Sequence, residues 1–144
     1  MKIIILNNSS DMQETIVSFL KKFKIANNEI FTFDNGFEAL DFIKRNGADI
    51  VFSDIEMPYM EGFEFAEIVL KLHPKLKNSF FAISGDENYD SYKKMEKNGV
   101  HRFLKKPIDY RIFEDFMMPE ILRVRFIEED LSATDIRYYL NQTS

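Results

Sequence analysis

Five short runs with an apolar centre alternate along this chain with segments whose apolar residues recur at helical spacing. The apolar runs cover residues 2–6, 29–34, 49–53, 80–83 and 101–105, and the helical patterns cover residues 11–24, 37–46, 63–70, 87–97 and a segment from 109 onward. Runs that are apolar without alternation are typical of strands buried on both faces, as in parallel sheets covered by helices. Right-handed crossovers leave few topologies for such a chain. We therefore predict an α/β fold, (βα)5, with a doubly wound five-stranded parallel sheet.

Polar residues mark the ends of the expected helices, and one proline interrupts the last of them. Ser10 with Gln13 three residues later is a capping-box pattern, which predicts the start of the first helix. Asp109 is placed to cap the last helix. Pro119 lacks a backbone N–H and crowds the preceding turn, so we expect the last helix to kink or end there.

The chain is expected to hold one domain, over residues 1–120, and a C-terminal extension over residues 121–144. The extension carries an acidic run at 128–130 and a short helical pattern at 132–140. It is too short for a separate output domain. Two interpretations stay open for it: a terminal helix packed on the domain, or a segment for dimerisation or partner docking.

Composition excludes several classes of function. The 144 residues suffice for one buried core, and the formal charge of −5 argues against a nucleic-acid partner held by bulk charge. The chain has no Cys, which excludes disulfides and Cys-ligated zinc and fits a reducing compartment. The apolar run Ile3–Leu6 is too short for a signal segment or a membrane span. We expect a soluble, cytoplasmic protein.

Reactive and polar side chains follow the expected strands at the point where each strand ends. Asp54 follows the third strand, Ser84 the fourth, Lys106 the fifth, and Asn7-Asn8 the first. Parallel strands bring their carboxyl ends to one edge of the sheet, so these residues should converge. These side chains suit the formation of an acyl phosphate. The carboxylate would attack phosphorus in line, and the lysine and the hydroxyl would contact the equatorial oxygens.

The spacing of these residues resembles the receiver domain of bacterial two-component response regulators, including the chemotaxis receivers. Three motifs carry the resemblance, over about residues 1–120: Asp54-x-x-Met57-Pro58-x-Met60-x-Gly62, Ser84-Gly85 and Lys106-Pro107. The resemblance implies a flavodoxin-like fold and a single-domain response regulator in phosphorelay signal transduction. It implies a signalling protein rather than an enzyme.

The resemblance also implies a role for each matching residue. Asp54 would accept a phosphoryl group from a histidine kinase or phosphotransfer protein. Lys106 would contact the phosphate, and the bond before Pro107 would be cis. Ser84 would be the switch hydroxyl. Phe103 stands at the position of the signalling aromatic, although a plain packing role is the alternative because Phe lacks a reporting hydroxyl.

The resemblance fails at the metal site. Family members bind Mg²⁺ with the phosphoacceptor, a backbone carbonyl at the Glu56 position and two acidic residues after the first strand, where this chain has Asn7 and Asn8. Asn8 is thus a degraded ligand position, and Asp54 is left as the main anionic ligand. Magnesium favours carboxylate oxygens, so we predict a weakened site. Three other carboxylates could compensate: Asp11, Asp86 and the Glu56 side chain.

Three functions compete on these grounds. A phosphate-switched receiver would signal to a downstream protein through the face formed by the fourth helix, fifth strand and fifth helix, and could form a homodimer. A phosphorylation-independent pseudo-receiver would hold Lys106 paired permanently with Asp54 as an interaction module. A phosphatase with Asp54 as nucleophile would need an acid two residues on, which Glu56 matches crudely, and a capping domain for which the chain lacks room.

Overall fold

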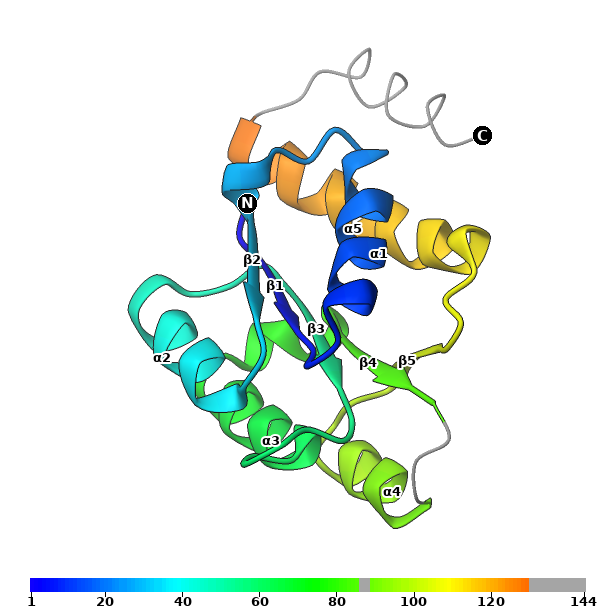
Figure 1. Ribbon diagram of the computed structural model, residues 1–144. Coiled ribbons are helices and arrows are strands. Elements are labelled where there is room, and N and C mark those ends of the chain that lie inside the picture. The colour runs from blue at the N-terminus through cyan, green and yellow to red at the C-terminus, as the bar shows by residue number, and fades with distance from the viewer. Residues whose placement is uncertain (86–88, 130–144) are drawn as a thin grey trace.

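Five parallel strands form one sheet in the order β2-β1-β3-β4-β5 (Figure 1). The computed structural model describes residues 1–85 and 89–129. The strands are β1 (Ile3–Leu6), β2 (Ile30–Phe33), β3 (Ile50–Asp54), β4 (Phe80–Ser84) and β5 (Arg102–Lys105). This order, with β2 and β5 at the edges, is the flavodoxin-like doubly wound topology. The predicted fold class is therefore confirmed.

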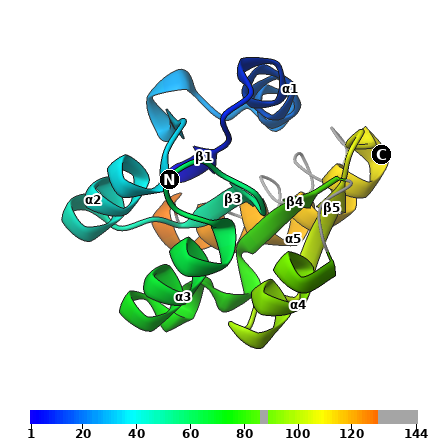
Figure 2. The same ribbon diagram turned by 60° about the horizontal axis from the view of Figure 1, so that its bottom comes forward.

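Helices cover both faces of the sheet. They are α1 (Ser10–Lys21), α2 (Gly36–Asn46), α3 (Gly62–Leu72), α4 (Tyr89–Lys97) and α5 (Tyr110–Glu129), with short 3₁₀ turns η1 (Asn27–Glu29) and η2 (Pro74–Asn78). Figures 1 and 2 show α1 and α5 on one face and α2, α3 and α4 on the other. In the part of the chain that the structure describes, no helix has the length and apolarity needed to cross a bilayer. The helical pattern at 132–140 lies outside the described residues.

Alternation along each strand divides the interior into two cores. In β1, Ile4 and Leu6 face the layer of α2, α3 and α4, whereas Ile3 and Ile5 face the layer of α1 and α5. Phenyl rings fill the second core: the ring centroid of Phe52 lies 5.4 Å from that of Phe81 and 5.6 Å from that of Phe113. Burial of a ring of this size contributes about 1.5–3 kcal/mol, so these rings fix the α1–α5 layer on the sheet.

The N-cap of the first helix lies one residue earlier than predicted, at Ser9 rather than Ser10. Ser9 has an extended backbone and its hydroxyl accepts a hydrogen bond from the Met12 N–H at 3.3 Å, so Ser9 is the N-cap and Ser10 is already helical. Gln13 is not part of a capping box. Its side-chain amide donates to the carbonyls of Asn7 and Phe33 and thereby ties the start of α1 to the ends of β1 and β2.

The last helix does not end at Pro119. α5 continues to Glu129, with Pro119 exposed inside it. The lost backbone bond therefore opens toward water, while Met117, Ile121 and Val124 continue the apolar stripe and are buried. Burying these side chains outweighs the roughly 3 kcal/mol that a proline costs inside a helix. The helix thus crosses residue 120, and the use of residues 121–144 in dimerisation or docking stays a prediction.

Candidate functional site

Asp54 is the last residue of β3, at the carboxyl edge of the sheet. The loops that follow the strands come forward in Figure 2. The Asp54 side chain is only 8% exposed, and its Oδ1 accepts a hydrogen bond from the Ile55 N–H at 2.9 Å. The strand therefore holds one carboxylate at the edge, with its backbone anchored on the paired strands.

Lys106 meets this carboxylate from the end of β5. Its Nζ lies 3.4 Å from both Oδ1 and Oδ2 of Asp54, so the ammonium is centred on the carboxylate. The peptide bond between Lys106 and Pro107 is cis, as the resemblance implied. The Lys106 N–H donates to the Ser84 carbonyl at 2.7 Å, which fixes the ends of β4 and β5 together. The structure thus brings Asp54, Ser84 and Lys106 to one edge, as the sequence predicted.

The loop after β3 is built on a close backbone approach at Gly62. The Gly62 N–H donates to the Ile55 carbonyl at 2.9 Å. A Cβ on Gly62 would collide with the Asp54 carbonyl oxygen and lie 2.7 Å from the Ile55 oxygen. Met57 and Met60 are buried beneath the loop, whereas Tyr59 is 90% exposed at a φ of 69°. The motif therefore specifies packing of the loop behind Asp54, a role that spacing alone did not reveal.

Asn7 is buried completely at the end of β1, beside Asp54 at the end of β3. Its Oδ1 accepts a hydrogen bond from the Ser9 N–H at 2.8 Å. Its Nδ2 is buried and has no acceptor within hydrogen-bonding distance among residues 1–85 and 89–129. This Asx-type turn, an Asn bonded to the backbone two residues on, could have been anticipated from the Asn-x-Ser pattern. Asn8, in contrast, is exposed.

The side chains at this edge fit a magnesium ion poorly. Asp54 offers an anionic ligand for the metal, but Lys106 already neutralises its charge. Asn7 uses its oxygen on Ser9 and is left with N–H groups, which a cation does not bind. Asp11 and the Glu56 side chain are exposed, and Asp86 lies outside the described residues. Within those residues, no group of three acidic or histidine side chains is placed to hold a metal.

Phe103 lies in the middle of β5 and is half-buried. Its ring stacks on the ring of Tyr92 in α4, with centroids 4.4 Å apart. Tyr92 and Phe103 both pack against the core of the α2–α3–α4 layer, so this pair connects β5 to α4. Of the other apolar residues of α4, Met95 is buried, whereas Tyr89 is 69% exposed. A switching role for Phe103 stays a prediction.

Several solved structures share this architecture, among them the following two. A response regulator receiver domain protein from Clostridium thermocellum is 22% identical, with a TM-score of 0.70 over 88% of this chain and 98% of that one. The Vibrio cholerae chemotaxis protein CheY4 is also 22% identical, with a TM-score of 0.64 over 85% of this chain and 97% of that one. At these identities the likeness shows the fold.

Sequence comparisons add the family. The response regulator receiver protein CpdR of Brucella abortus is 30% identical over 79 residues, which cover 55% of this chain and 63% of CpdR. The matches span 5%, 19% and 63% of the first curated relatives, so those proteins extend well beyond the shared region. The family model described as response regulator receiver domain matches residues 3–121. Because this match covers most of the chain, the chain belongs to the response regulator receiver domain family.

Proposed function

We propose that this receiver domain accepts a phosphoryl group at Asp54 from a histidine kinase or phosphotransfer protein and signals through protein contacts. The observation that carries the proposal is the ion pair at the carboxyl edge, in which Lys106 Nζ lies 3.4 Å from both Asp54 oxygens. A nucleophilic carboxylate with a cation at equal distance from its two oxygens suits in-line phosphoryl transfer. The proposed partners are proteins, rather than nucleic acid or a membrane.

The chemistry follows from the arrangement. One Asp54 oxygen attacks the phosphorus of a phosphohistidine, the new O–P bond forms as the P–N bond breaks, and the electron pair of that bond returns to the imidazole nitrogen. Lys106, whose side chain is 34% exposed, has room to move from the carboxylate to the phosphoryl oxygens. The Ser84 hydroxyl would then donate a hydrogen bond to one of these oxygens. Phe103, in the neighbouring strand β5, would then change its side-chain position.

Magnesium is expected to take a reduced part. Receiver domains typically bind Mg²⁺ at the phosphorylation site. Here Asn7 and Asn8 replace the acidic pair, and a lost outer partner of a metal alone costs about 10–100-fold in affinity. We therefore expect magnesium affinity to be lower than in relatives by at least about that factor. The Glu56 backbone carbonyl and Asp54 would be the remaining ligands.

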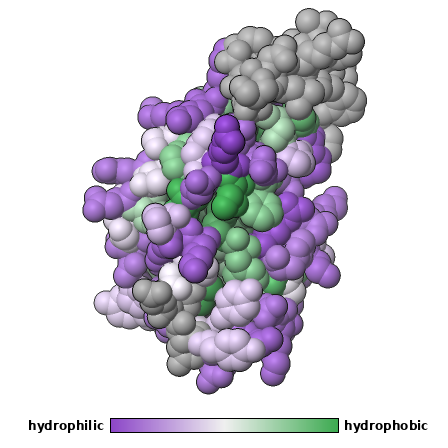
Figure 3. All heavy atoms as spheres, turned by 90° about the vertical axis from the view of Figure 1, so that its right-hand side faces the viewer, coloured by the Kyte–Doolittle hydropathy of each residue, from purple (hydrophilic) through white to green (hydrophobic). Residues whose placement is uncertain are grey.

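The proposed downstream surface is the face formed by α4, β5 and α5. Figure 3 shows a band of apolar side chains between hydrophilic ones on the side of the molecule where β5 is the sheet edge. Ile112 at the start of α5 is 52% exposed, and it lines a hollow with the exposed Pro107 and with the buried Leu104 and Ile108. Exposed apolar side chains that gather over several elements suit a protein partner.

Phosphorylation is tested by mass analysis after incubation with a small phosphodonor and magnesium. We expect one phosphoryl group on the wild type, none on Asp54→Asn, and an unchanged amount on Asp41→Asn, a matched change at an aspartate that is 64% exposed on α2. Failure of the wild type at high magnesium, together with a gain in the Asn7→Asp/Asn8→Asp double variant, would refute the proposal.

A second candidate function is a phosphorylation-independent interaction module. The same ion pair supports it, since a Lys106 that never leaves Asp54 would hold one conformation. This candidate predicts that partner affinity does not change in Asp54→Asn. A change of tenfold or more, equivalent to about 1.4 kcal/mol, would exclude it.

A further inference from the structure

The side-chain amide of Asn7 can point in only one direction. The Ser9 backbone N–H is a donor and must face an acceptor, and the Asn7 oxygen lies 2.8 Å from it. Turning the amide over would bring two donors together and lose this bond. The Nδ2 group is therefore directed away from the turn, buried and without an acceptor in the described parts of the chain. A buried donor in this state is rare and calls for a physical reason.

Strand geometry places this donor next to the phosphoacceptor. Leu6 pairs with Ser53 across β1 and β3, so Asn7 and Asp54, the next residues on each strand, are neighbours. Side chains alternate along a strand, and Ile5 and Phe52 both face the α1–α5 layer. Asn7 and Asp54 continue these two rows toward the same side. The free N–H groups of Asn7 thus lie beside the carboxylate that would carry a ligand.

We propose that the Asn7 amide donates a hydrogen bond to an anionic, phosphoryl-like group bound at Asp54, and that this site consequently holds such a group without a divalent cation. The Asn7 N–H group would stabilise a negative phosphoryl oxygen, which is one of the roles that a metal ion has in such a site. The inference rests on the proposed function of Asp54 and specifies its ligand as an anion recognised by Asn7, Lys106 and Ser84.

The variant Asn7→Asp isolates this role. A carboxylate has the shape of the amide and still offers an oxygen to the Ser9 N–H, so the turn is kept. Only the free donor is exchanged for an acceptor. That acceptor repels a phosphoryl oxygen and attracts a cation. Asn28→Asp is the control, since it adds the same charge at an exposed position in η1, which precedes β2 and lies away from the carboxyl edge of the sheet.

The test uses beryllofluoride, whose beryllium bonds to a carboxylate oxygen and stands in for the phosphoryl group. Adduct formation is followed by ¹⁹F NMR in metal-depleted buffer and again with magnesium. For the wild type we expect affinities within about threefold of each other in the two buffers, whereas loss of one hydrogen bond to a charged group should weaken Asn7→Asp without metal by about 10–100-fold. Magnesium should restore binding to Asn7→Asp. Asn28→Asp should bind without metal as the wild type does.

The outcomes separate the inference from the proposed function. A wild-type adduct that forms only with magnesium would overturn the inference and leave Asp54 as the phosphoacceptor. Equal metal-free affinity of the wild type and Asn7→Asp would overturn the role of Asn7. No wild-type adduct in either buffer would overturn both proposals. If Asn7→Asp does not fold, the ¹⁵N-labelled wild type decides: the Asn7 amide protons should shift and exchange more slowly on adduct formation, and unchanged amide signals would contradict the inference.

Discussion

Replacing Gly62 by alanine should move the backbone that carries Asp54, the proposed phosphoacceptor. Gly62 is the first residue of α3, and its N–H bonds to Ile55 directly after Asp54. A Cβ there would collide with the Asp54 carbonyl oxygen and lie 2.7 Å from the Ile55 oxygen and 2.9 Å from the Ile55 Cα. All three atoms belong to the backbone, and Asp54 is paired with Ile83 in the sheet. The clash therefore cannot be relieved by rotating a side chain.

The expected loss of unfolding free energy in Gly62→Ala can be estimated by comparison with Gly36. Gly36 is likewise buried and likewise the first residue of its helix, but its Cβ would meet the flexible Met60 side chain, at 2.9 Å from the sulfur. Overpacking costs about 1–3 kcal/mol, while Gly→Ala at an allowed backbone conformation gains about 0.4–1 kcal/mol through the unfolded state. We expect Gly62→Ala to lose about 2–3 kcal/mol of unfolding free energy, and Gly36→Ala to stay within about 1 kcal/mol of the wild type.

Urea unfolding followed by circular dichroism measures this difference. With an m-value of about 2 kcal/mol/M, the Gly62→Ala midpoint should fall by about 1–1.5 M. Phosphorylation by a small donor should slow on the order of 100-fold, because a shift of about 1 Å in the nucleophile has that effect. Equal midpoints for the two alanine variants, or an undiminished phosphorylation rate in Gly62→Ala, would refute the steric argument.

Two further predictions concern α5. Asp109→Ala should lower the unfolding free energy by about 1 kcal/mol, measured by urea titration against Asp109→Asn, because the Asp109 carboxylate accepts from the Arg111 and Ile112 N–H groups at 2.8 and 3.2 Å. Arg125→Met should cost about 2–3 kcal/mol, since Arg125 makes two 3.1 Å bonds to Glu29 from a buried position. Burial alone would raise the pKa of the Glu29 carboxyl, but the Ala26 N–H and the Arg125 guanidinium outweigh it and hold that pKa below its ordinary 4.5. The wild type's advantage over Arg125→Met should therefore be full above pH 4.5 and shrink as the pH falls through the lowered pKa, and a constant advantage would contradict this assignment.

Sequence patterns predicted the elements at the centre of the fold because β1, β3 and β4 are buried on both faces. Such strands read as unbroken apolar runs, and β1 is an instance, with all four residues fully buried. Predictions from local sequence patterns were wrong where tertiary packing outweighed local preference. A proline is a helix breaker by local rule, yet α5 passes Pro119 because Met117 and Ile121 bury their side chains on the sheet around it.

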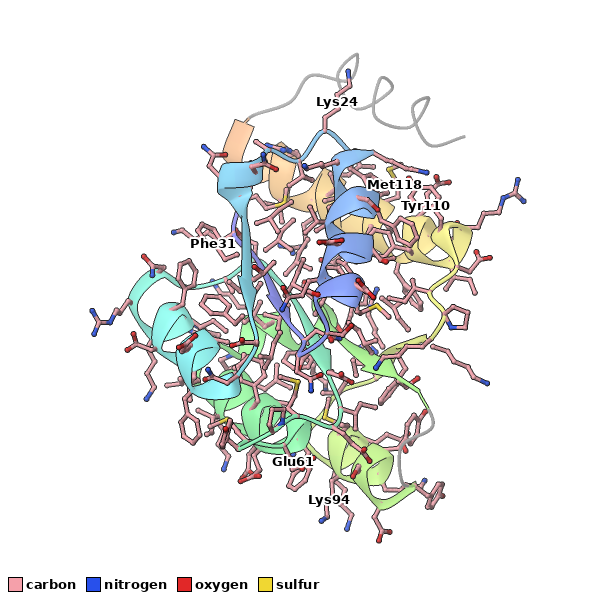
Figure 4. The ribbon with its side chains drawn as sticks, in the orientation of Figure 1. Lys24, Phe31, Glu61, Lys94, Tyr110 and Met118 are labelled. Carbon is pink, nitrogen blue, oxygen red and sulfur yellow. The ribbon has the colours of Figure 1, made fainter. Side chains whose placement is uncertain are left out.

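The site shows a similar division. Parallel topology alone dictates that residues after β1, β3, β4 and β5 converge, so Asp54, Ser84 and Lys106 could be named from the sequence. The hydrogen-bond donor of Asn7 could not be predicted from the sequence, because either end of an asparagine amide can face the site. Its direction depends on a single bond to the Ser9 N–H. Figure 4 likewise shows Tyr110 at the start of α5 beside α1, where its ring lies 5.0 Å from that of Phe19, a contact between distant segments that periodicity does not specify.

The proposed phosphate switch depends on the hydrogen-bond donors at this edge, since the proposed magnesium site is weak. Moving a two-state equilibrium from about 1:99 to 99:1 takes about 5.5 kcal/mol of differential binding. A hydrogen bond to a charged group contributes about 1.5–3 kcal/mol, so Lys106 alone falls short, the more so because it must first leave Asp54. Lys106, Ser84 and Asn7 together reach about 4.5–9 kcal/mol, which covers the requirement. Losing the Asn7 donor brings the sum to about 3–6 kcal/mol, at the margin of switching. With the Asn7 N–H groups directed away from the Ser9 turn, the sum over all three donors favours the proposed phosphate switch over the fixed interaction module.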